Sequence, residues 1–342
     1  MRLLAAVFAL AALAHAAPAA EPDIRTAIAD GLKYLAADSV EWKTERKCAS
    51  CHHAPMALWA LYEAKKHGYT VDDKAVAELA TWLLAKDDPA KINPKQPKPT
   101  TPPAVLVNQT PLMLALGLAA GDVKDSSTRD GLKAMLALVL EGQATDGSWR
   151  LMYVWEPLGS TPDVMTTLAL LALTGQAAAD RGAESKAALE KGLKWLEAAT
   201  PSDTPQAAAL RLLLWKRLGR PAADWEPLAK KLLAWQHTDG GWGQGKDMES
   251  DAFSTGQALY ALAEVGRKQD APAIRQACDY LVKSQAEDGS WEMASRPGGP
   301  SGKSAKNLAP ITTAGTAWAV LGLVHQASAI AEPEAVPERT KK

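Results

Sequence analysis

Apolar residues recur at helical spacing along most of this chain, in two alternating kinds of segment. Segments of the first kind are amphipathic, because their apolar positions lie three and four residues apart with polar positions between them. Segments of the second kind are more uniformly apolar and rich in Ala and Leu, which predicts helices buried on most sides. The amphipathic segments cover residues 23–37, 73–87, 126–141, 183–199, 223–236 and 270–284. The apolar segments cover residues 51–67, 105–120, 162–178, 204–218, 251–266 and 311–327.

The strict alternation of these segments predicts an all-α fold. We expect each amphipathic helix to lie on the outside and the apolar helix that follows it to lie on the inside, which gives six helix pairs. Such pairs form an (α/α)6 toroid when the sixth pair packs beside the first. One domain of this kind accounts for residues 17–330, and the polar tail at 331–342 is expected to be disordered.

A short motif occurs three times in the second half of the chain. The stretches Gln143 to Trp149, Gln236 to Trp242 and Gln285 to Trp291 share the pattern Q-x-x-D-G-x-W. Their starts are 93 and 49 residues apart, so the first step is close to two units of about 47 residues, a length that suits paired helices. The Asp-Gly pair predicts a tight turn. We expect the tryptophans to be structural, because buried aromatic residues usually pack rather than react.

The repeated motif resembles the QW motif of the squalene-hopene cyclase and oxidosqualene cyclase superfamily. The stretches Gln257 to Leu262 and Thr316 to Leu321 also look like inner helices of that superfamily. The resemblance covers about residues 120–327. It implies an α/α toroid in which each QW glutamine ties one outer helix to its neighbour while the tryptophan stacks on it.

The catalytic residues of that superfamily are largely missing. Class II cyclases protonate their substrate with the middle aspartate of a D-x-D-D motif, and the matching stretch begins at Asp163 but has Met165 at the acid position. The related protein prenyltransferases hold zinc with Asp, Cys and His. Asp251 matches their aspartate, but Phe253 replaces the cysteine and Thr312 stands where a histidine is expected. The resemblance leaves Asp163 and Asp251 as the acidic candidates for a site in the toroid cavity.

The stretch Cys48-Ala49-Ser50-Cys51-His52 indicates a different chemistry. C-x-x-C-H is the spacing with which c-type cytochromes bond haem through both thiols and ligate its iron with the histidine. On a helix, Cys48 and His52 share a face, so a single turn can serve a porphyrin edge and the proximal imidazole. We therefore expect one covalent haem c per chain, bound by Cys48, Cys51 and His52, with His52 as the proximal iron ligand.

Three other interpretations of this motif stay open. The cysteines could form a redox-active pair, a structural disulfide, or half of a zinc site that would need two further Cys or His ligands. The next histidine outside the motif's own pair is His67, a full helix later. The preceding Lys43, Arg46 and Lys47 suit haem propionates or an acidic partner, or else a solvated loop. Trp42 resembles a degenerate QW tryptophan.

The second iron ligand is expected from the mouth of the ring, where the inner helices begin. The candidates are Met293, Met152, Met248, Met165 and His237. Met293 is preferred because it precedes the sixth inner helix, which adjoins the first on closure. Methionine ligation suits electron transfer, whereas an open position suits a small molecule. His67 and His325 lie at the far helix ends, some ~25 Å away at 1.5 Å per residue, and do not easily reach the iron.

The first residues predict export. An apolar run from Leu3 to Leu13 follows Met1-Arg2, and Ala14-His15-Ala16 is a small-x-small cleavage site. We expect residues 1–16 to be a signal peptide and the mature protein to be periplasmic or secreted, which is the oxidising setting that haem attachment requires. The apolar run is shorter than the ~20 residues that span a bilayer, and no later stretch is suitable, so no transmembrane segment is expected.

Composition narrows the possible partners. A net charge of -1 gives no electrostatic case for binding nucleic acid or an anionic membrane. Twelve tryptophans against two phenylalanines suit the repeated structural use of tryptophan in the QW motif. The third cysteine, Cys278, aligns with Leu32 and Leu193 of other outer helices, so we expect a buried hydrophobic residue rather than a reactive thiol.

Three functional hypotheses follow from the sequence. The first is an exported haem-c protein on a squalene-cyclase-like toroid, which exchanges electrons with a redox partner protein or binds a small molecule at the haem. The second is an isoprenoid- or lipid-processing enzyme of the terpenoid-cyclase-like class that lacks the D-x-D-D acid and acts on an apolar small molecule. The third is a scaffold for protein contacts. Only the first rests on a chemically specific motif.

Overall fold

The described part of the chain consists almost entirely of helices. The computed structural model describes residues 24–46, 53–84, 109–121, 126–151, 156–157, 161–175, 182–267, 271–294, 306 and 308–330. The predicted signal peptide and the predicted C-terminal tail lie outside these ranges. Within them, no helix is both long enough and apolar enough to cross a bilayer.

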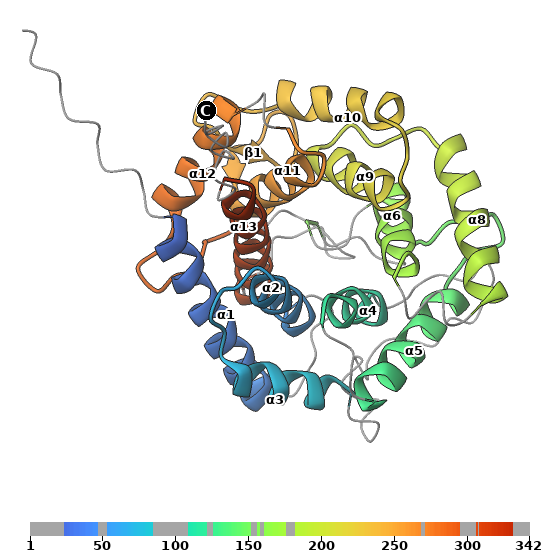
Figure 1. The fold of residues 1–342 in the computed structure, drawn as a ribbon, viewed down its shortest axis with the longest axis horizontal. Coiled ribbons are helices and arrows are strands. Elements are labelled where there is room, and N and C mark those ends of the chain that lie inside the picture. Colours follow the sequence, from blue (N-terminus) through green and yellow to red (C-terminus); the bar gives the residue numbers. More distant parts are fainter. Residues whose placement is uncertain are drawn as a thin grey trace, which may run out of the picture.

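Two concentric layers of helices form a ring (Figure 1). The outer layer consists of α1 (Ile24–Arg46), α3 (Asp73–Leu84), α5 (Ser126–Glu141), α8 (Ala183–Ala198), α10 (Ala222–Ala234) and α12 (Ala271–Ser284). The inner layer consists of α2 (Ala54–Lys66), α4 (Thr110–Ala120), α6 (Pro162–Leu173), α9 (Pro205–Arg217), α11 (Ala252–Glu264) and α13 (Ala309–Ile330). The predicted all-α toroid of six helix pairs is confirmed.

The two layers differ in burial as the apolar patterns predict. In α6 every residue from Asp163 to Leu173 is buried, whereas α12 buries only the stripe Ile274, Ala277, Cys278 and Leu281. Cys278 is 1% exposed, and burial raises the pKa of its thiol to about 12, which confirms it as a core residue. Several boundaries differ from the prediction. The largest difference is at the end of α1, which continues to Arg46 instead of residue 37, while α2 begins at Ala54, α4 begins at Thr110 and α6 ends at Leu173.

The QW glutamines join neighbouring outer helices. Each one donates its side-chain N–H to a backbone carbonyl of the next outer helix around the ring. The pairs are Gln143 with Ala188 of α8 at 2.9 Å, Gln236 with Ala273 of α12 at 2.8 Å, and Gln285 with Ala27 of α1 at 2.9 Å. The third pair connects the last outer helix to the first, so it closes the ring.

The QW tryptophans are buried beneath these joints, with exposures of 0 to 1%. Each indole N–H donates to a carbonyl in the preceding outer helix, and each backbone N–H donates to a threonine hydroxyl of the following inner helix. For Trp242 the two acceptors are Leu232 at 2.7 Å and Thr255 at 2.9 Å. The same geometry recurs at Trp149 and Trp291. Their structural role is therefore confirmed, and the threonines are a part of the motif that the Q-x-x-D-G-x-W pattern omits.

The motif glycine is needed for the same joint. Gly289 has a φ of 88°, a conformation that L side chains rarely adopt. A Cβ on Gly289 would also lie 2.4 Å from the carbonyl oxygen of Asp30 in α1. Only glycine lets the turn after α12 pack directly on the backbone of the first outer helix.

The inner helices α11 and α13 approach each other closely. A Cβ on Gly256 would lie 2.1 Å from the carbonyl oxygen of Trp318, so the two backbones touch at this point. The Trp318 ring contacts Trp59 of α2, with centroids 5.1 Å apart, and Phe253 of α11, with centroids 6.1 Å apart. Three neighbouring inner helices are thus packed around one buried tryptophan.

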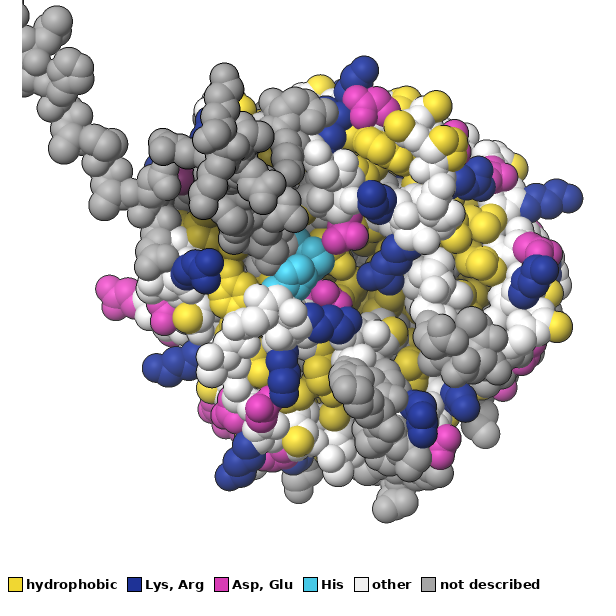
Figure 2. Space-filling view, viewed as in Figure 1, with side chains coloured by type: hydrophobic (Ala, Val, Ile, Leu, Met, Phe, Trp, Pro, Cys, Tyr) yellow, Lys and Arg dark blue, Asp and Glu magenta, His cyan; other side chains and the backbone are white. Residues whose placement is uncertain are grey.

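A short hairpin precedes α11. Strand β1 (Trp242–Gly243) pairs antiparallel with β2 (Ser250–Asp251), and Trp242 lies opposite Asp251. Figure 2 shows one face of the ring, on which histidine and acidic side chains lie together near the centre. The ring therefore brings chemically active side chains to its middle.

Candidate functional site

The haem motif falls in the connection between the first outer helix and the first inner helix. Cys48, Cys51 and His52 lie outside the described residues, so their assignment stays a prediction. The described chain fixes both ends of the connection, because α1 ends at Arg46 and His53 is the residue before α2. The described residues nearest to the motif in sequence are therefore the last turn of α1 and His53.

His53 anchors the end of this connection in the wall of the ring. Its side chain is fully buried, and its Nε2 lies 2.9 Å from Oδ2 of Asp38 in α1. The Thr313 hydroxyl of α13 donates to the same oxygen at 2.7 Å. Tyr34 is a further neighbour of Asp38, and burial together with the Asp38 carboxylate raises its pKa to about 12. One aspartate thus links the first outer helix to the first and last inner helices, right beside the motif.

Trp42 belongs to this wall and is no QW tryptophan. It lies within α1, and its ring stacks on the His53 imidazole with centroids 4.4 Å apart and planes at 22°. The guanidinium of Arg46 lies 5.6 Å from the Trp42 ring centroid. The comparison with a degenerate QW motif was wrong because α1 runs nine residues further than its apolar pattern.

The basic residues before the motif are already engaged in part. Lys43 forms an ion pair with Glu78 of α3 at 2.7 Å, so it ties two outer helices together. The interpretation of Lys43 as a partner of a haem propionate stays a prediction. Lys47 lies outside the described residues. Arg46 remains exposed at the end of α1.

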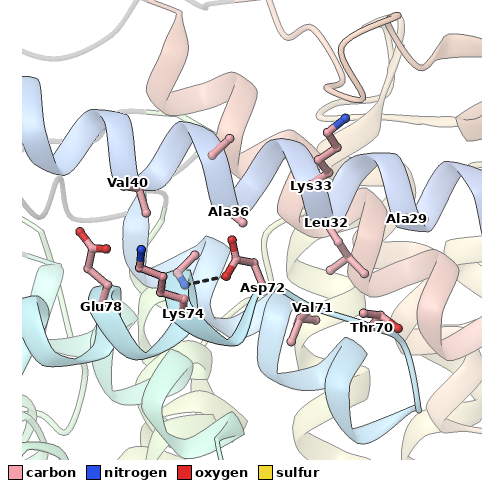
Figure 3. Close-up of a pocket in the computed structure, with 12 residues that line it drawn as sticks. Ala29, Leu32, Lys33, Ala36, Val40, Thr70, Val71, Asp72, Lys74 and Glu78 are labelled. Atoms are coloured by element: carbon pink, nitrogen blue, oxygen red, sulfur yellow. Dashed lines mark hydrogen bonds between the residues drawn. The ribbon is translucent and has the colours of Figure 1, made fainter.

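The groove beside this contact lies between α1 and α3 (Figure 3). It has a volume of about 580 Å³, and its charged lining residues are Lys33, Asp72, Lys74 and Glu78. Asp72 accepts a hydrogen bond from the backbone N–H of Ala75 at 3.0 Å, which caps the start of α3. Glu78 pairs with Lys43. Asp72 and Glu78 therefore serve the packing of two outer helices, and none of the predicted site residues that the structure describes lines the groove.

Of the distal-ligand candidates, Met293 lies at the wall formed by α13. It is 3% exposed, and its Cγ would lie 2.6 Å from a Cβ on Gly315. The thioether is therefore packed on the second turn of the helix that also carries Thr313. Met165 is fully buried in α6, and Nδ1 of His237 lies 2.9 Å from the Ser250 hydroxyl in the hairpin.

The structure says less about the remaining two candidates for the distal iron ligand. Met152 lies outside the described residues, and Met248 lies in the hairpin loop. Met293 remains our first candidate for the distal ligand.

Asp163 is held by hydrogen bonds at the start of α6. Its carboxylate accepts from the Thr161 hydroxyl at 2.6 Å, and from the hydroxyl and backbone N–H of Ser202 at 2.7 and 2.8 Å. Burial alone would raise its pKa, but these bonds outweigh burial and lower it. A carboxylate stabilised in its charged form is the opposite of a proton-donating acid. Asp163 instead ties α6 to the turn before α9.

Asp251 also has a structural contact. It is the N-cap of α11, and its side chain accepts the backbone N–H of Ser254 at 2.7 Å. It also belongs to strand β2, opposite Trp242. Both acidic candidates therefore begin inner helices, and Met165 occupies the acid position of the cyclase motif with a thioether.

Replacing Asp163 by asparagine should destabilise the fold by about 1–3 kcal/mol, because a buried hydrogen-bond network loses its charged acceptor. Since the folded-state pKa is lowered, the carboxylate stabilises the fold above its unfolded pKa of about 3.9 and this contribution is lost as pH falls through the folded value. Denaturant unfolding at neutral pH and below about pH 4 should show a gap between wild type and variant that narrows with acid.

The matched control is Asp203→Asn. Asp203 lies in the same turn but is exposed, and it pairs with Lys231 at 2.6 Å. Its replacement should change stability little. An equal loss in both variants would contradict the special role of Asp163.

The sequence and the fold can now be compared with known proteins. Residues 226–337 match the squalene-hopene cyclase C-terminal domain family. The chain resembles the terpenoid cyclases. A drimenyl diphosphate synthase from Streptomyces showdoensis is 33% identical over 103 residues, which are 30% of this chain and 18% of that protein. The matched stretch is thus a small part of the relative's length.

Solved structures extend the resemblance to most of the ring. A type II terpene cyclase from Scytonema, solved with geranylgeranyl dihydroxybenzoate, has a TM-score of 0.51 at 16% identity and covers 89% of this chain and 98% of its own. A polysaccharide lyase has a TM-score of 0.55 at 12% identity and covers 88% of this chain and 97% of its own. At such identities these likenesses establish the fold alone.

Sequence reasoning missed the contacts of His53, the residue after the motif. Asp38 and Trp42 of α1 contact His53, and Thr313 of the distant α13 donates to the same Asp38. A polar stretch after residue 37 offered no periodic signal for the last turns of α1. The position of Thr313 beside α1 depends on ring closure, which brings α13 next to the first helix pair.

Proposed function

We propose that this chain is a terpenoid-cyclase-like toroid that carries a covalent haem c and works outside the cytoplasm in electron transfer or in binding a small molecule. The observation that supports this most directly is the C-x-x-C-H stretch, Cys48 to His52, between α1 and α2. Two thiols and an imidazole at this spacing are the donor set of a c-type haem. When bound, haem would supply one-electron redox chemistry or an iron position for a small ligand.

The described residues beside the motif are compatible with this role. The fully buried His53 and its contact with Asp38 hold the start of α2 in place, so the two thiols and His52 would sit on a rigid support. Trp42 stacks on His53 and belongs to the same contact. We infer that these residues hold the end of the attachment segment.

The lack of the acid that class II cyclases use also favours the haem proposal over cyclisation of a polyene. Met165 cannot donate a proton, and Asp163 is stabilised in its ionised form. Protonation of a polyene at this end of α6 therefore has no donor among these two residues.

The test is the state of haem in the purified protein. Full-length protein from a host with cytochrome c maturation should keep its Soret absorption in the pellet after acid-acetone extraction. It should also give a pyridine haemochrome spectrum of a bis-thioether haem. Colourless protein from such a host would reject the proposal.

A prediction concerns the second iron ligand. Met293→Ala should remove the weak long-wavelength band of a ferric His/Met pair and lower the reduction potential, because thioether ligation favours reduced iron. Met113→Ala serves as the control, since Met113 is equally buried, at 5%, but lies within α4. A wild-type protein without that band, which binds carbon monoxide quickly, would show an open position and reject Met293.

A second candidate function is an isoprenoid- or lipid-processing activity in the ring. It is favoured by the sequence match of residues 226–337 to the squalene-hopene cyclase C-terminal domain. Incubation with squalene and with farnesyl diphosphate, followed by mass spectrometry of the extracts, separates the two. Conversion by haem-free protein would favour the second candidate.

A further inference from the structure

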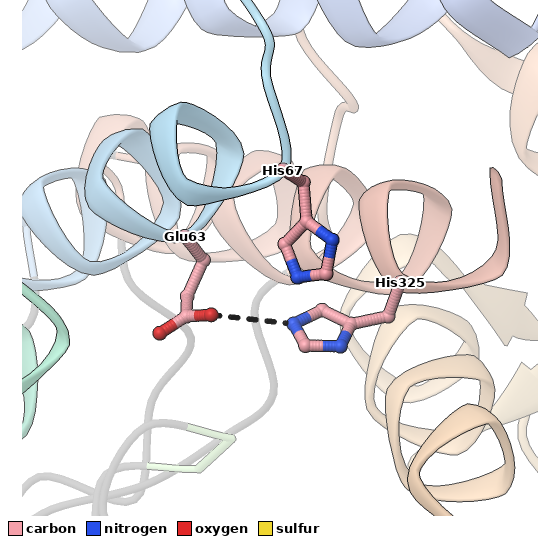
Figure 4. Close-up of side chains that lie close together, drawn as sticks. All are labelled: Glu63, His67 and His325. Carbon is pink, nitrogen blue, oxygen red and sulfur yellow. Dashed lines mark ion pairs between the residues drawn. The ribbon is translucent and has the colours of Figure 1, made fainter. Parts of the chain in front are cut away.

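A second group of chemically active side chains lies at the C-terminal ends of the inner helices, at the opposite ends from His53 and Asp163. Glu63 and His67 are one turn apart at the end of α2, and His325 comes from α13 (Figure 4). One ligand atom from each of these three residues lies within 4.8 Å of the other two. Glu264, the last residue of α11, lies behind His325.

The distances within this cluster suit an ion better than direct hydrogen bonding. Nε2 of His325 lies 3.5 Å from Oε2 of Glu63, and this nitrogen makes no hydrogen bond among the described residues. Two ligand atoms bound tetrahedrally to Zn²⁺ at about 2.0–2.1 Å lie about 3.3 Å apart. The rings of His67 and His325 have centroids 4.6 Å apart at 60°, so they do not stack flat on each other.

The outer contacts orient the central histidine. Nδ1 of His325 lies 3.1 Å from Oε1 of Glu264, which fixes the ring with Nε2 toward Glu63 and His67. A carboxylate behind a histidine is the usual support of a zinc-bound imidazole. The Tyr260 ring lies 3.9 Å from the His325 ring and blocks its other side.

Burial and charge favour a cation at this point. His325 is 8% exposed and Glu63 is 9% exposed. The helices α2 and α11 both end here, and the negative ends of their dipoles attract positive charge. Lys66 binds the other oxygen of Glu63, at 3.2 Å, and leaves Oε2 directed at the histidines.

We propose that Glu63, His67 and His325 form a Zn²⁺ site in which Glu264 holds His325 in position and water completes a tetrahedron. Two imidazoles and one carboxylate are a common zinc donor set with one position left open. Such an ion connects α2 to α13, which are the first and last inner helices. The site is independent of the haem motif and stands or falls separately from the proposed function.

The test is zinc binding by full-length protein stripped with a chelator and titrated with Zn²⁺ against a chromogenic competitor. The wild type should bind one equivalent that His67→Gln or His325→Gln weakens about 100-fold or more. Glu264→Gln should weaken binding about 10–100-fold, as for other outer carboxylates. Glu190→Gln, at an exposed position of α8, is the matched control and should bind like the wild type.

The cysteines of the motif require their own control, because thiols also bind zinc. The Cys48→Ser/Cys51→Ser double variant should still bind one equivalent of Zn²⁺. Protein loaded with Co²⁺ in place of Zn²⁺ should show visible absorption bands but no sulfur-to-cobalt charge-transfer band. Zinc that is lost with the cysteines but kept in His325→Gln would overturn the proposal. So would a wild type that binds no more zinc than His325→Gln while both have the same circular dichroism spectrum.

Discussion

Replacing Cys48 and Cys51 together by serine should abolish covalent haem in protein from a maturation-competent periplasm. Each single substitution should leave haem held by one thioether, because the two thiols bond separate vinyl positions of the porphyrin. Intact mass spectrometry after acid-acetone treatment measures this directly: the wild type should carry one haem, each single variant a haem on a single bond, and the double variant none. The change is from full to zero occupancy, so it is the largest effect expected here.

Cys278→Ser provides the control for this experiment. Cys278 is buried in α12 and remote in sequence from the motif, so its replacement should leave haem attached while costing stability. His52→Ala should shift the optical spectrum even where both thioethers form, since it removes the iron ligand and keeps the thiols. A wild-type mass without haem would reject the attachment altogether.

Trp242→Ala should destabilise the protein by about 3–5 kcal/mol, the cost of removing a large side chain from a close-packed core. Trp242 is fully buried, its indole donates to Leu232, and its backbone N–H donates to Thr255. Chemical denaturation with an unchanged slope should show the loss as a lower midpoint. The optical spectrum of the bound haem should not change, because this residue joins helices.

Trp235→Ala is the matched control for that variant. Trp235 is the C-cap residue of α10, the helix whose Leu232 accepts the Trp242 indole N–H. It is only half-buried and has the Lys231 ammonium 4.8 Å from its ring. Its loss should cost clearly less. Equal stability of Trp242→Ala and wild type, or an altered haem spectrum at unchanged stability, would reverse the structural assignment of the QW motif.

The two layers of the toroid could be predicted because the burial of a helix face requires apolar residues at helical spacing. An outer helix such as α12 needs one apolar stripe, and an inner helix such as α6 needs apolar residues all round. The end of α1 could not be predicted in this way. Its last turns are stabilised by particular contacts, such as Lys43 with Glu78 and Trp42 with His53, which leave no periodic pattern.

The candidate sites were predictable only in part. The C-x-x-C-H spacing is local, so Cys48, Cys51 and His52 could be proposed from the sequence alone, and their assignment stays a prediction. The contact of His67 with His325 depends on the register of α13 along α2. That register is determined by packing, including the edge contact of the Trp59 ring in α2 with the Trp318 ring in α13. From the sequence we could infer that His67 and His325 lie far from the iron, because both are at far helix ends. We could not infer that they contact each other.

The joint between Gln285 and Ala27 has a consequence for the order in which this chain can fold. The two residues are 258 positions apart, and contacts of such separation form late because a long loop must be closed first. Until α12 and α13 have folded, α1 lacks the two helices on which it packs at the ring closure, and Asp38 lacks the hydrogen bond from Thr313. The described residues on either side of the C-x-x-C-H motif, at the end of α1 and at His53, therefore complete their packing only when the ring closes. If Cys48 and Cys51 receive haem, as proposed above, we predict that the attachment precedes this last folding step.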